Sequence, residues 1–184
     1  LKDWLVYTGI TNDPYVVERG RFEDLCMELG NVEALKLIVA NASSGGHAYG
    51  AEYLKFSIEK NDMDYLESLL QAGVNPSKTD EDGYSAVYWA LYNKNNNALL
   101  MLLKYGAKVN TTYKSSSESA LHMAVRNEDI DAVAYLLRAG IDLEIENYDG
   151  KTACQLAKKK KFKDIAKLIR TAERGKLEYY NTKW

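Results

Sequence analysis

The stretch from residue 119 to residue 140, SALHMAVRNEDIDAVAYLLRAG, contains two helical patterns separated by a turn. Ser119 precedes the first pattern and suits a helix N-cap, because its hydroxyl accepts hydrogen bonds from free backbone amides. Leu121 and Val125 then lie four residues apart on one apolar face. The polar run at 127–129 interrupts this periodicity and predicts the turn between two helices.

The second half of the same stretch is also amphipathic. Ile130, Val133 and Leu136 keep helical spacing on one face. Gly140 follows them where a helix commonly ends in the left-handed conformation, which glycine adopts without a steric penalty. The stretch therefore predicts a helix–turn–helix unit followed by an extended connection.

This unit recurs along the chain with a fixed period of about 33 residues, which is typical of stacked repeats. Leu-Leu-like pairs keep the period to within one residue, at Leu69-Leu70, Leu102-Leu103, Leu136-Leu137 and Leu168-Ile169. Glycines follow the first three pairs in the same phase, at Gly73, Gly106 and Gly140. Small residues precede all four pairs, at Ser57, Ala90, Ala124 and Ala157. Because three residue classes keep one register, the sequence predicts an all-α solenoid of stacked units.

Three segments resemble the motif that opens an ankyrin repeat, Asp-Gly-x-Thr-Pro-Leu-His-x-Ala: residues 82–90 (DGYSAVYWA), 119–124 (SALHMA) and 149–157 (DGKTACQLA). Residues 106–110 (GAKVN) resemble the end of the family's closing motif, Leu-Leu-x-x-Gly-Ala-x-Val-Asn. The resemblance implies an all-α ankyrin-repeat solenoid of stacked helix–turn–helix units with short, hairpin-like finger loops. The chain departs from the family at the Thr-Pro pair and at the glycine between the helices, which is replaced by Asn61, Lys94, Glu128 and Lys161.

The repeats divide the chain into a central array and two flanks. We expect an N-terminal flank with a short capping helix over 1–19, an array of about five repeats over 20–170 and a C-terminal tail over 171–184. The expected repeats are 20–49, 50–79, 80–113, 114–146 and 147–170. The fourth repeat gains one residue near 111–115, where an insertion at the tip of a finger loop costs little stability.

The ankyrin family binds other proteins on the concave surface formed by its fingers and first helices, so the resemblance implies a non-enzymatic protein-binding module. The family's variable positions give the expected partner-binding residues: Tyr49, Glu59, Glu81, Asp82, Tyr84, Tyr92, Asn93, Glu118, Arg126, Tyr148, Asp149, Lys151, Lys159 and Lys160. The chain contains 14 Tyr against 3 Phe, and tyrosine is enriched at interface hot spots. We therefore prefer Tyr84 and Tyr92 as the anchors.

Three other residues are expected to be structural. Tyr88 and His122 fall at the position of the family's histidine, whose side chain usually hydrogen-bonds the backbone between repeats. Trp89 lies between core positions and is expected to pack against them.

Residues that commonly carry catalysis are scarce. The chain has 2 His and 2 Cys, and the cysteines, Cys26 and Cys154, fall in the first and fifth expected repeats. Helix layers about 10 Å apart would separate them by roughly 40 Å, too far for a disulfide or a shared metal. We therefore expect no enzyme, and no metal, cofactor or small-molecule substrate.

Charge is divided between the two ends of the chain. Residues 1–150 carry 13 Lys and Arg against 23 Asp and Glu, a net of −10, whereas residues 151–184 carry 11 against 3, a net of +8. The lysine run at 158–163 is either the solvated outer face of the last repeat or a docking patch for an anionic surface or nucleic acid. The first interpretation is favoured, so neither nucleic acid nor a membrane is an expected partner.

Three functions are compatible with these features. The preferred one is binding of a partner protein by a chain that is monomeric when free. The first alternative is an inhibitor or immunity-type protein that neutralises one enzyme or toxin, with an acidic groove that speeds association. The second alternative is anionic docking through the lysine run. Free cysteines favour the cytoplasm, and removal of a leader before Leu1 would instead place the protein in an exported or periplasmic location.

Overall fold

The structure is a computed structural model, and it describes residues 49–80, 82–113 and 117–175. The expected capping helix, almost all of the expected first repeat, and most of the expected tail lie outside these residues.

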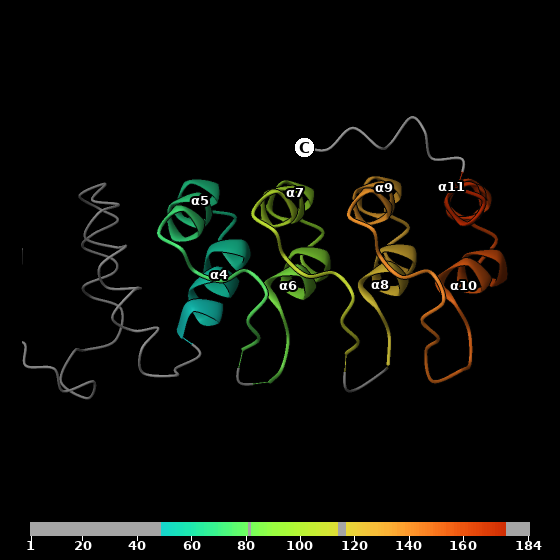
Figure 1. The fold of residues 1–184 in the computed structure, drawn as a ribbon, viewed down its shortest axis with the longest axis horizontal. Helices are drawn as coiled ribbons and strands as arrows, with labels where there is room; N and C mark the ends of the chain where they lie inside the picture. Colours follow the sequence, from blue (N-terminus) through green and yellow to red (C-terminus); the bar gives the residue numbers. More distant parts are fainter. Residues whose placement is uncertain (1–48, 81, 114–116, 176–184) are drawn as a thin grey trace, which may run out of the picture.

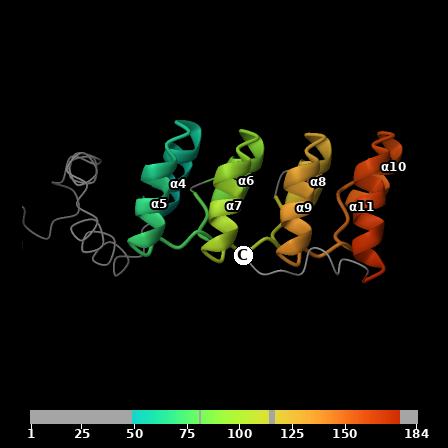
Figure 2. The same cartoon turned by 90° about the horizontal axis from the view of Figure 1, so that it is seen from above.

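The described residues form eight helices arranged as four helix pairs. In chain order they are α4 (Tyr49–Glu59), α5 (Met63–Gln71), α6 (Ala86–Tyr92), α7 (Asn96–Lys104), α8 (Ala120–Arg126), α9 (Ile130–Arg138), α10 (Ala153–Lys159) and α11 (Lys163–Glu173). The first helix of each pair lies in one layer and the second helix in another, and the pairs follow one another along a single axis (Figure 1; Figure 2). The predicted all-α solenoid is confirmed. Helix α11 continues three residues beyond residue 170, where the array was expected to end.

Most of the helices begin where a side-chain oxygen accepts hydrogen bonds from the free amides of the first turn. Such N-caps are Asp62, Ser85, Asn95, Asp129 and Thr152. These caps recur in the same phase in successive repeats, which explains why the helix starts repeat with the sequence period.

Each finger loop connects one helix pair to the next, and its two sides are joined by an isolated antiparallel bridge. The bridges pair Thr79 with Ser85, Thr112 with Ser119, and Glu146 with Thr152. The second bridge encloses one residue more than the other two. The insertion predicted for the fourth repeat therefore lies within its finger, as expected.

The apolar pairs pack between the two helix layers. Leu69, Leu102 and Leu136 are completely buried at equivalent positions. In the last repeat the equivalent residue is Ile169, because it stands as far from the start of α11 as Leu136 does from the start of α9, and it is equally buried. The fourth predicted pair, Leu168-Ile169, was thus placed one residue too early, and the second position of that pair is taken by Arg170.

The four residues that replace the family's inter-helix glycine all have a left-handed backbone. The φ angles are 54° at Asn61, 52° at Lys94, 56° at Glu128 and 65° at Lys161. This conformation costs a residue with a Cβ about 1–2 kcal/mol, and asparagine tolerates it better than lysine or glutamate. The turn geometry of the family is therefore kept without its glycine.

Candidate functional site

The inner surface of the array consists of the exposed sides of the first helices and the fingers that project from them (Figure 1). The second helices cover the opposite side of the first-helix layer. Within this surface, aromatic side chains gather on α6, on the finger that precedes it and on the finger that follows α7.

We call Tyr84, Tyr88, Trp89, Tyr92 and Tyr113 the aromatic cluster. The rings of Tyr84 and Tyr88 are stacked with centroids 4.1 Å apart, and Tyr88 is stacked on Tyr92 at 5.9 Å. Trp89 meets Tyr88 and Tyr92 edge to face, at 5.2 Å and 5.8 Å. Both arrangements are favourable for aromatic pairs. The cluster therefore holds its rings in fixed orientations before any partner binds.

Trp89 is held from two sides. Its indole Nε1 donates a 2.7 Å hydrogen bond to Asp80 Oδ2, and Lys55 Nζ of α4 lies 4.2 Å from the ring centroid. The other carboxylate oxygen of Asp80 accepts a 2.7 Å hydrogen bond from the Tyr84 amide within the finger, so this one carboxylate closes the finger and joins it to α6. Trp89 is partly buried against the core, and the prediction that it packs is confirmed.

Tyr113 joins the cluster from the next finger. It occupies the position held by Asp80 and Asn147 in the other fingers, where a buried side-chain oxygen accepts backbone amides. At Tyr113 the ring is buried instead against Tyr88, at 4.7 Å between centroids. Its hydroxyl is buried and has no hydrogen-bond partner among the residues that the structure describes. Burial raises the pKa of this phenol well above its usual value.

Replacing Tyr113 with phenylalanine is expected to raise the free energy of unfolding by about 1 kcal/mol, because the substitution removes a buried polar group that has no partner. Urea unfolding of the full chain measures the change. Tyr105→Phe, which removes a hydroxyl from an exposed ring, is the control and should change stability by less than about 0.5 kcal/mol. A loss of stability in Tyr113→Phe would mean that the hydroxyl has a partner.

His122 has the structural role that the sequence predicts. The side chain is fully buried, its Nδ1 lies 2.9 Å from the Ser119 hydroxyl, and its Nε2 lies 2.8 Å from the Lys151 carbonyl oxygen. It therefore ties one repeat to the next finger. Tyr88 holds the equivalent position in α6 and also connects neighbouring repeats, but through its ring contact with Tyr113.

The last residues of the four first helices form one row across the inner surface, which we call the inner row: Glu59, Tyr92, Arg126 and Lys159. All four are exposed, and Tyr92 is the most exposed ring of the aromatic cluster, at 62%. The charge of the row changes from negative at Glu59 to positive at Arg126 and Lys159.

Glu118, an expected partner contact, is only 8% exposed and forms an ion pair with Arg126. Arg126 therefore has more exposed surface available to a partner protein than Glu118 has.

The remaining expected contacts lie in three places. Asp82, Tyr148 and Asp149 are exposed in the fingers, and Lys151 is partly exposed where the last finger returns to α10. Lys160 is exposed just beyond α10. Glu81 and the side chain of Tyr49 lie outside the residues that the structure describes. That these residues bind a partner stays a prediction.

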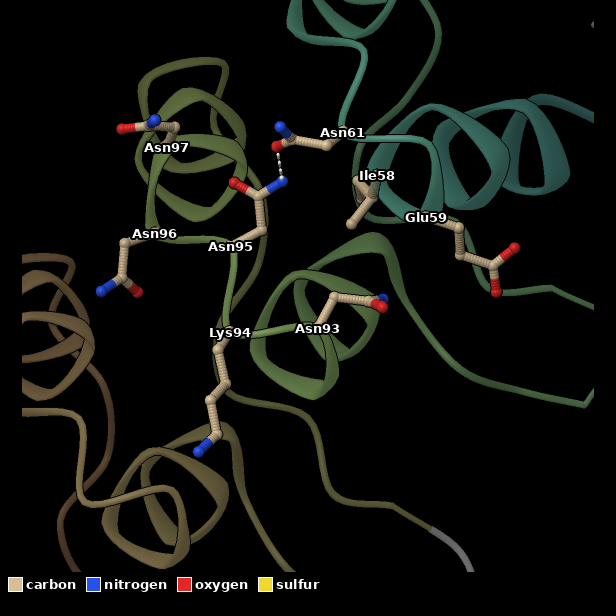
Figure 3. Close-up of a pocket in the computed structure, with 8 residues that line it drawn as sticks. All are labelled: Ile58, Glu59, Asn61, Asn93, Lys94, Asn95, Asn96 and Asn97. Carbon is tan, nitrogen blue, oxygen red and sulfur yellow. Dashed lines mark hydrogen bonds between the residues drawn. The ribbon is translucent and has the colours of Figure 1, made fainter.

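A hollow of about 460 Å³ lies beside the inner row, between the ends of α4 and α6 and the start of α7 (Figure 3). Its lining is mostly polar: Ile58, Glu59, Asn61, Asn93, Lys94, Asn95, Asn96 and Asn97. Asn95 Nδ2 donates to Asn61 Oδ1 at 2.9 Å, which links two repeats along the hollow. The structure thus brings two expected contacts, Glu59 and Asn93, to one hollow.

Sequence reasoning named four residues of the aromatic cluster, but it did not group them and it did not include Tyr113. It selected Tyr84 and Tyr92 as contacts, but it did not place Tyr113 or Lys55 beside them. The available signal was positional, since Tyr113 lies one repeat period after Asp80 and interrupts a row of short polar residues.

The described residues contain no group of three or more His, Cys, Asp or Glu side chains placed to hold a metal ion. Within the same residues, none of the helices combines the length and the apolar character needed to cross a membrane.

The described part of the chain has four stacked helix pairs, fingers along one edge and an exposed aromatic residue on its inner surface, and these features define a helical repeat solenoid. Two family models match the chain, both described as ankyrin repeats: one over residues 24–113 and the other over residues 95–137. Together they span more than half of the 184 residues. The chain belongs to the ankyrin-repeat family, and it is a protein–protein interaction module.

Curated proteins with similar sequences carry the same repeats in different settings. BRCA1-associated RING domain protein 1 of Caenorhabditis elegans is 35% identical over 133 residues, 72% of this chain and 19% of the relative. I-kappa-B like protein N2 of Microplitis demolitor bracovirus is 34% identical over 115 residues, 59% of this chain and 62% of the relative. Cyclin-dependent kinase 4 inhibitor B of Homo sapiens is 28% identical over 110 residues, 60% of this chain and 79% of the relative. The chain thus spans less than two thirds of the first two relatives.

Proposed function

We propose that this chain binds a partner protein on its inner surface, with the aromatic cluster as the anchor. The observation that carries the proposal is the exposed ring of Tyr92, which is stacked on Tyr88 and meets the edge of Trp89. A ring that is already ordered loses less conformational entropy on binding, at about 0.5–1.5 kcal/mol for each side chain that would otherwise be immobilised. Large aromatic side chains are the usual hot spots of protein interfaces.

The inner row suggests how the partner is oriented. Glu59 lies on one side of Tyr92, and Arg126 and Lys159 lie on the other. A partner with a basic group over α4 and acidic groups over α8 and α10 complements this row. Exposed charge pairs add little affinity, about 0–1 kcal/mol each, but they select orientation and speed association.

Photo-crosslinking tests this location. The photoreactive amino acid benzoylphenylalanine is placed at Tyr92 in one variant and at Tyr105 in another, and each is irradiated in native lysate. Both tyrosines are exposed, but Tyr92 ends α6 on the inner surface, whereas Tyr105 caps the second helix α7. We expect a discrete crosslinked protein from position 92 and none from position 105. Crosslinking of the same protein only from position 105 would contradict the proposal.

An inhibitory role is the second candidate. It is favoured by the similarity to cyclin-dependent kinase 4 inhibitor B, since the match includes 79% of that protein. In this role the chain would occupy a surface that its partner needs for activity. Once the crosslinked partner is identified, its activity is measured with increasing amounts of this chain. If the chain is an inhibitor, the partner's activity falls in proportion to the bound fraction. If the activity does not change, the chain binds the partner without inhibiting it.

A further inference from the structure

The terminal face of the array is the outer side of α10 and α11, which no other described repeat covers. The equivalent position of the three preceding first helices holds Ile58, Leu91 and Val125, all of them buried. In α10 this position holds Lys158, which is exposed. A position that is apolar and buried in the three preceding first helices is therefore occupied by an exposed lysine in α10.

The second helices carry the same replacement. Leu70, Leu103 and Leu137 are buried at one position of α5, α7 and α9. Arg170 takes this position in α11 and is exposed. Burial of an unpaired cation against an apolar surface is strongly unfavourable, so the terminal face suits water or an anionic group better than an apolar surface.

Cations also form a stripe along α11. Lys163, Lys167 and Arg170 of α11 and its C-cap residue Arg174 lie at positions i, i+4, i+7 and i+11, and all four are exposed. This spacing puts them on one side of the helix. At a rise of 1.5 Å per residue the stripe is about 16 Å long, which is the length of about five residues of extended chain.

A hollow of about 450 Å³ lies within the terminal face. It is lined by Lys158, Lys161, Phe162, Lys163, Asp164, Ala166, Lys167 and Arg170. Between residues 158 and 174 there are eight Lys and Arg against two carboxylates, Asp164 and Glu173. None of these eight cations forms an ion pair with a carboxylate of the described residues. The face therefore carries positive charge that is not neutralised within the described array.

We propose that the terminal face binds an acidic segment of a protein, at least about five residues long. This surface does not include the aromatic cluster, so the inference goes beyond the proposed function and stands apart from it. Carboxylates along the segment pair with the cationic stripe, and the methylene groups of a glutamate lie against Phe162 in the hollow. Most of the cations are lysines, which act as flexible point charges and can follow carboxylates that are not rigidly placed.

A protein segment suits this face better than a bilayer or a duplex does. A bilayer surface is flat and gains nothing from a hollow with Phe162 and Ala166 in its lining. A duplex carries one charge per about 1.7 Å and extends well beyond the stripe. Glu128 of the preceding repeat borders the terminal face beside Lys163, and it repels a polyanion that extends in that direction.

The test measures the fluorescence anisotropy of labelled hexaglutamate as the full chain is added, at low and at physiological ionic strength. The terminal variant carries Lys163→Glu, Lys167→Glu and Arg170→Glu. The matched control carries the same charge change at three other exposed cations, as Lys78→Glu, Lys104→Glu and Lys108→Glu. We expect the terminal variant to bind at least about tenfold more weakly and the control to stay within about threefold. Hexaglutamine should not bind.

Several results would overturn the inference. They are an absence of hexaglutamate binding to the unaltered chain, an equal loss in both variants, and tighter binding of duplex DNA or of phosphatidylserine–phosphatidylcholine vesicles through the same three residues. Circular dichroism melts establish that each variant folds, and the corresponding Lys→Gln and Arg→Gln changes replace any variant that does not. Tyr92→Ala should bind hexaglutamate as the unaltered chain does, so failure of the proposed partner binding on the inner surface can be distinguished from failure of this inference.

Discussion

Replacing Tyr84 and Tyr92 together with alanine is expected to weaken binding of the partner protein by about 4 kcal/mol, roughly a thousandfold in Kd. The two rings lie at opposite ends of a stack whose centre is Tyr88. Their loss removes the apolar contact area, and it also frees Tyr88 to change rotamer. Isothermal titration calorimetry with the crosslinked partner, once it is produced in pure form, measures the change.

The control for this prediction is an aromatic residue on the other side of the array. Tyr105→Ala removes an equally large exposed ring from the second-helix layer and should leave Kd within about twofold. Tyr92→Phe keeps the ring and should retain most of the affinity, because the apolar area dominates. Unchanged affinity in a double variant that folds stably would exclude the aromatic cluster as the anchor.

The sequence alone is sufficient for much of the fold, because the features that define it are local. Thr152, for example, lies three residues before Gln155 and caps α10 within one turn. The buried leucine at the centre of α5, α7 and α9 depends only on helical spacing. The extra finger residue follows from counting between repeats. None of these inferences needs knowledge of a contact between distant residues.

Errors and omissions arose where a particular side-chain contact, and not the repeat period, decides the outcome. Leu168 and Ile169 are both apolar, and the sequence pattern alone did not select which of them faces the core. Glu118 looks like an exposed finger residue, but Arg126 draws its carboxylate into an ion pair. The ring of Tyr113 is buried because it packs against the aromatic rings of the neighbouring repeat. The Tyr113 contact is formed only when repeats stack, whereas Glu118 and Arg126 pair within one repeat.

The inner surface and the terminal face also differ in how they would bind. The aromatic cluster is ordered and largely apolar, so it is suited to affinity that changes little with salt. The terminal face is cationic, so its contribution falls as salt screens charge beyond a distance of about 8–10 Å. Measuring partner affinity against ionic strength therefore separates the two contributions within one complex.

Glycine at three of the inter-helix turns is expected to stabilise the array by about 2–3 kcal/mol in total, as Lys94→Gly, Glu128→Gly and Lys161→Gly. Each residue now has a left-handed backbone, which costs a side chain with a Cβ about 1–2 kcal/mol. Glycine removes that strain, although it also increases the entropy of the unfolded chain by the equivalent of about 0.4–1 kcal/mol. The sites lie in separate repeats, so their effects should nearly add.

Two controls show whether backbone strain is the cause. Asn61→Gly should change stability little, because asparagine tolerates the left-handed region and its side chain also accepts a hydrogen bond from Asn95. Lys104→Gly, in the last turn of α7, should destabilise by up to about 1 kcal/mol, because glycine there only weakens a right-handed helix. Urea unfolding of each variant gives the free energies. If the triple variant were less stable than the unaltered chain, the left-handed turns would not be strained, and their lysine and glutamate side chains would have to contribute contacts of their own.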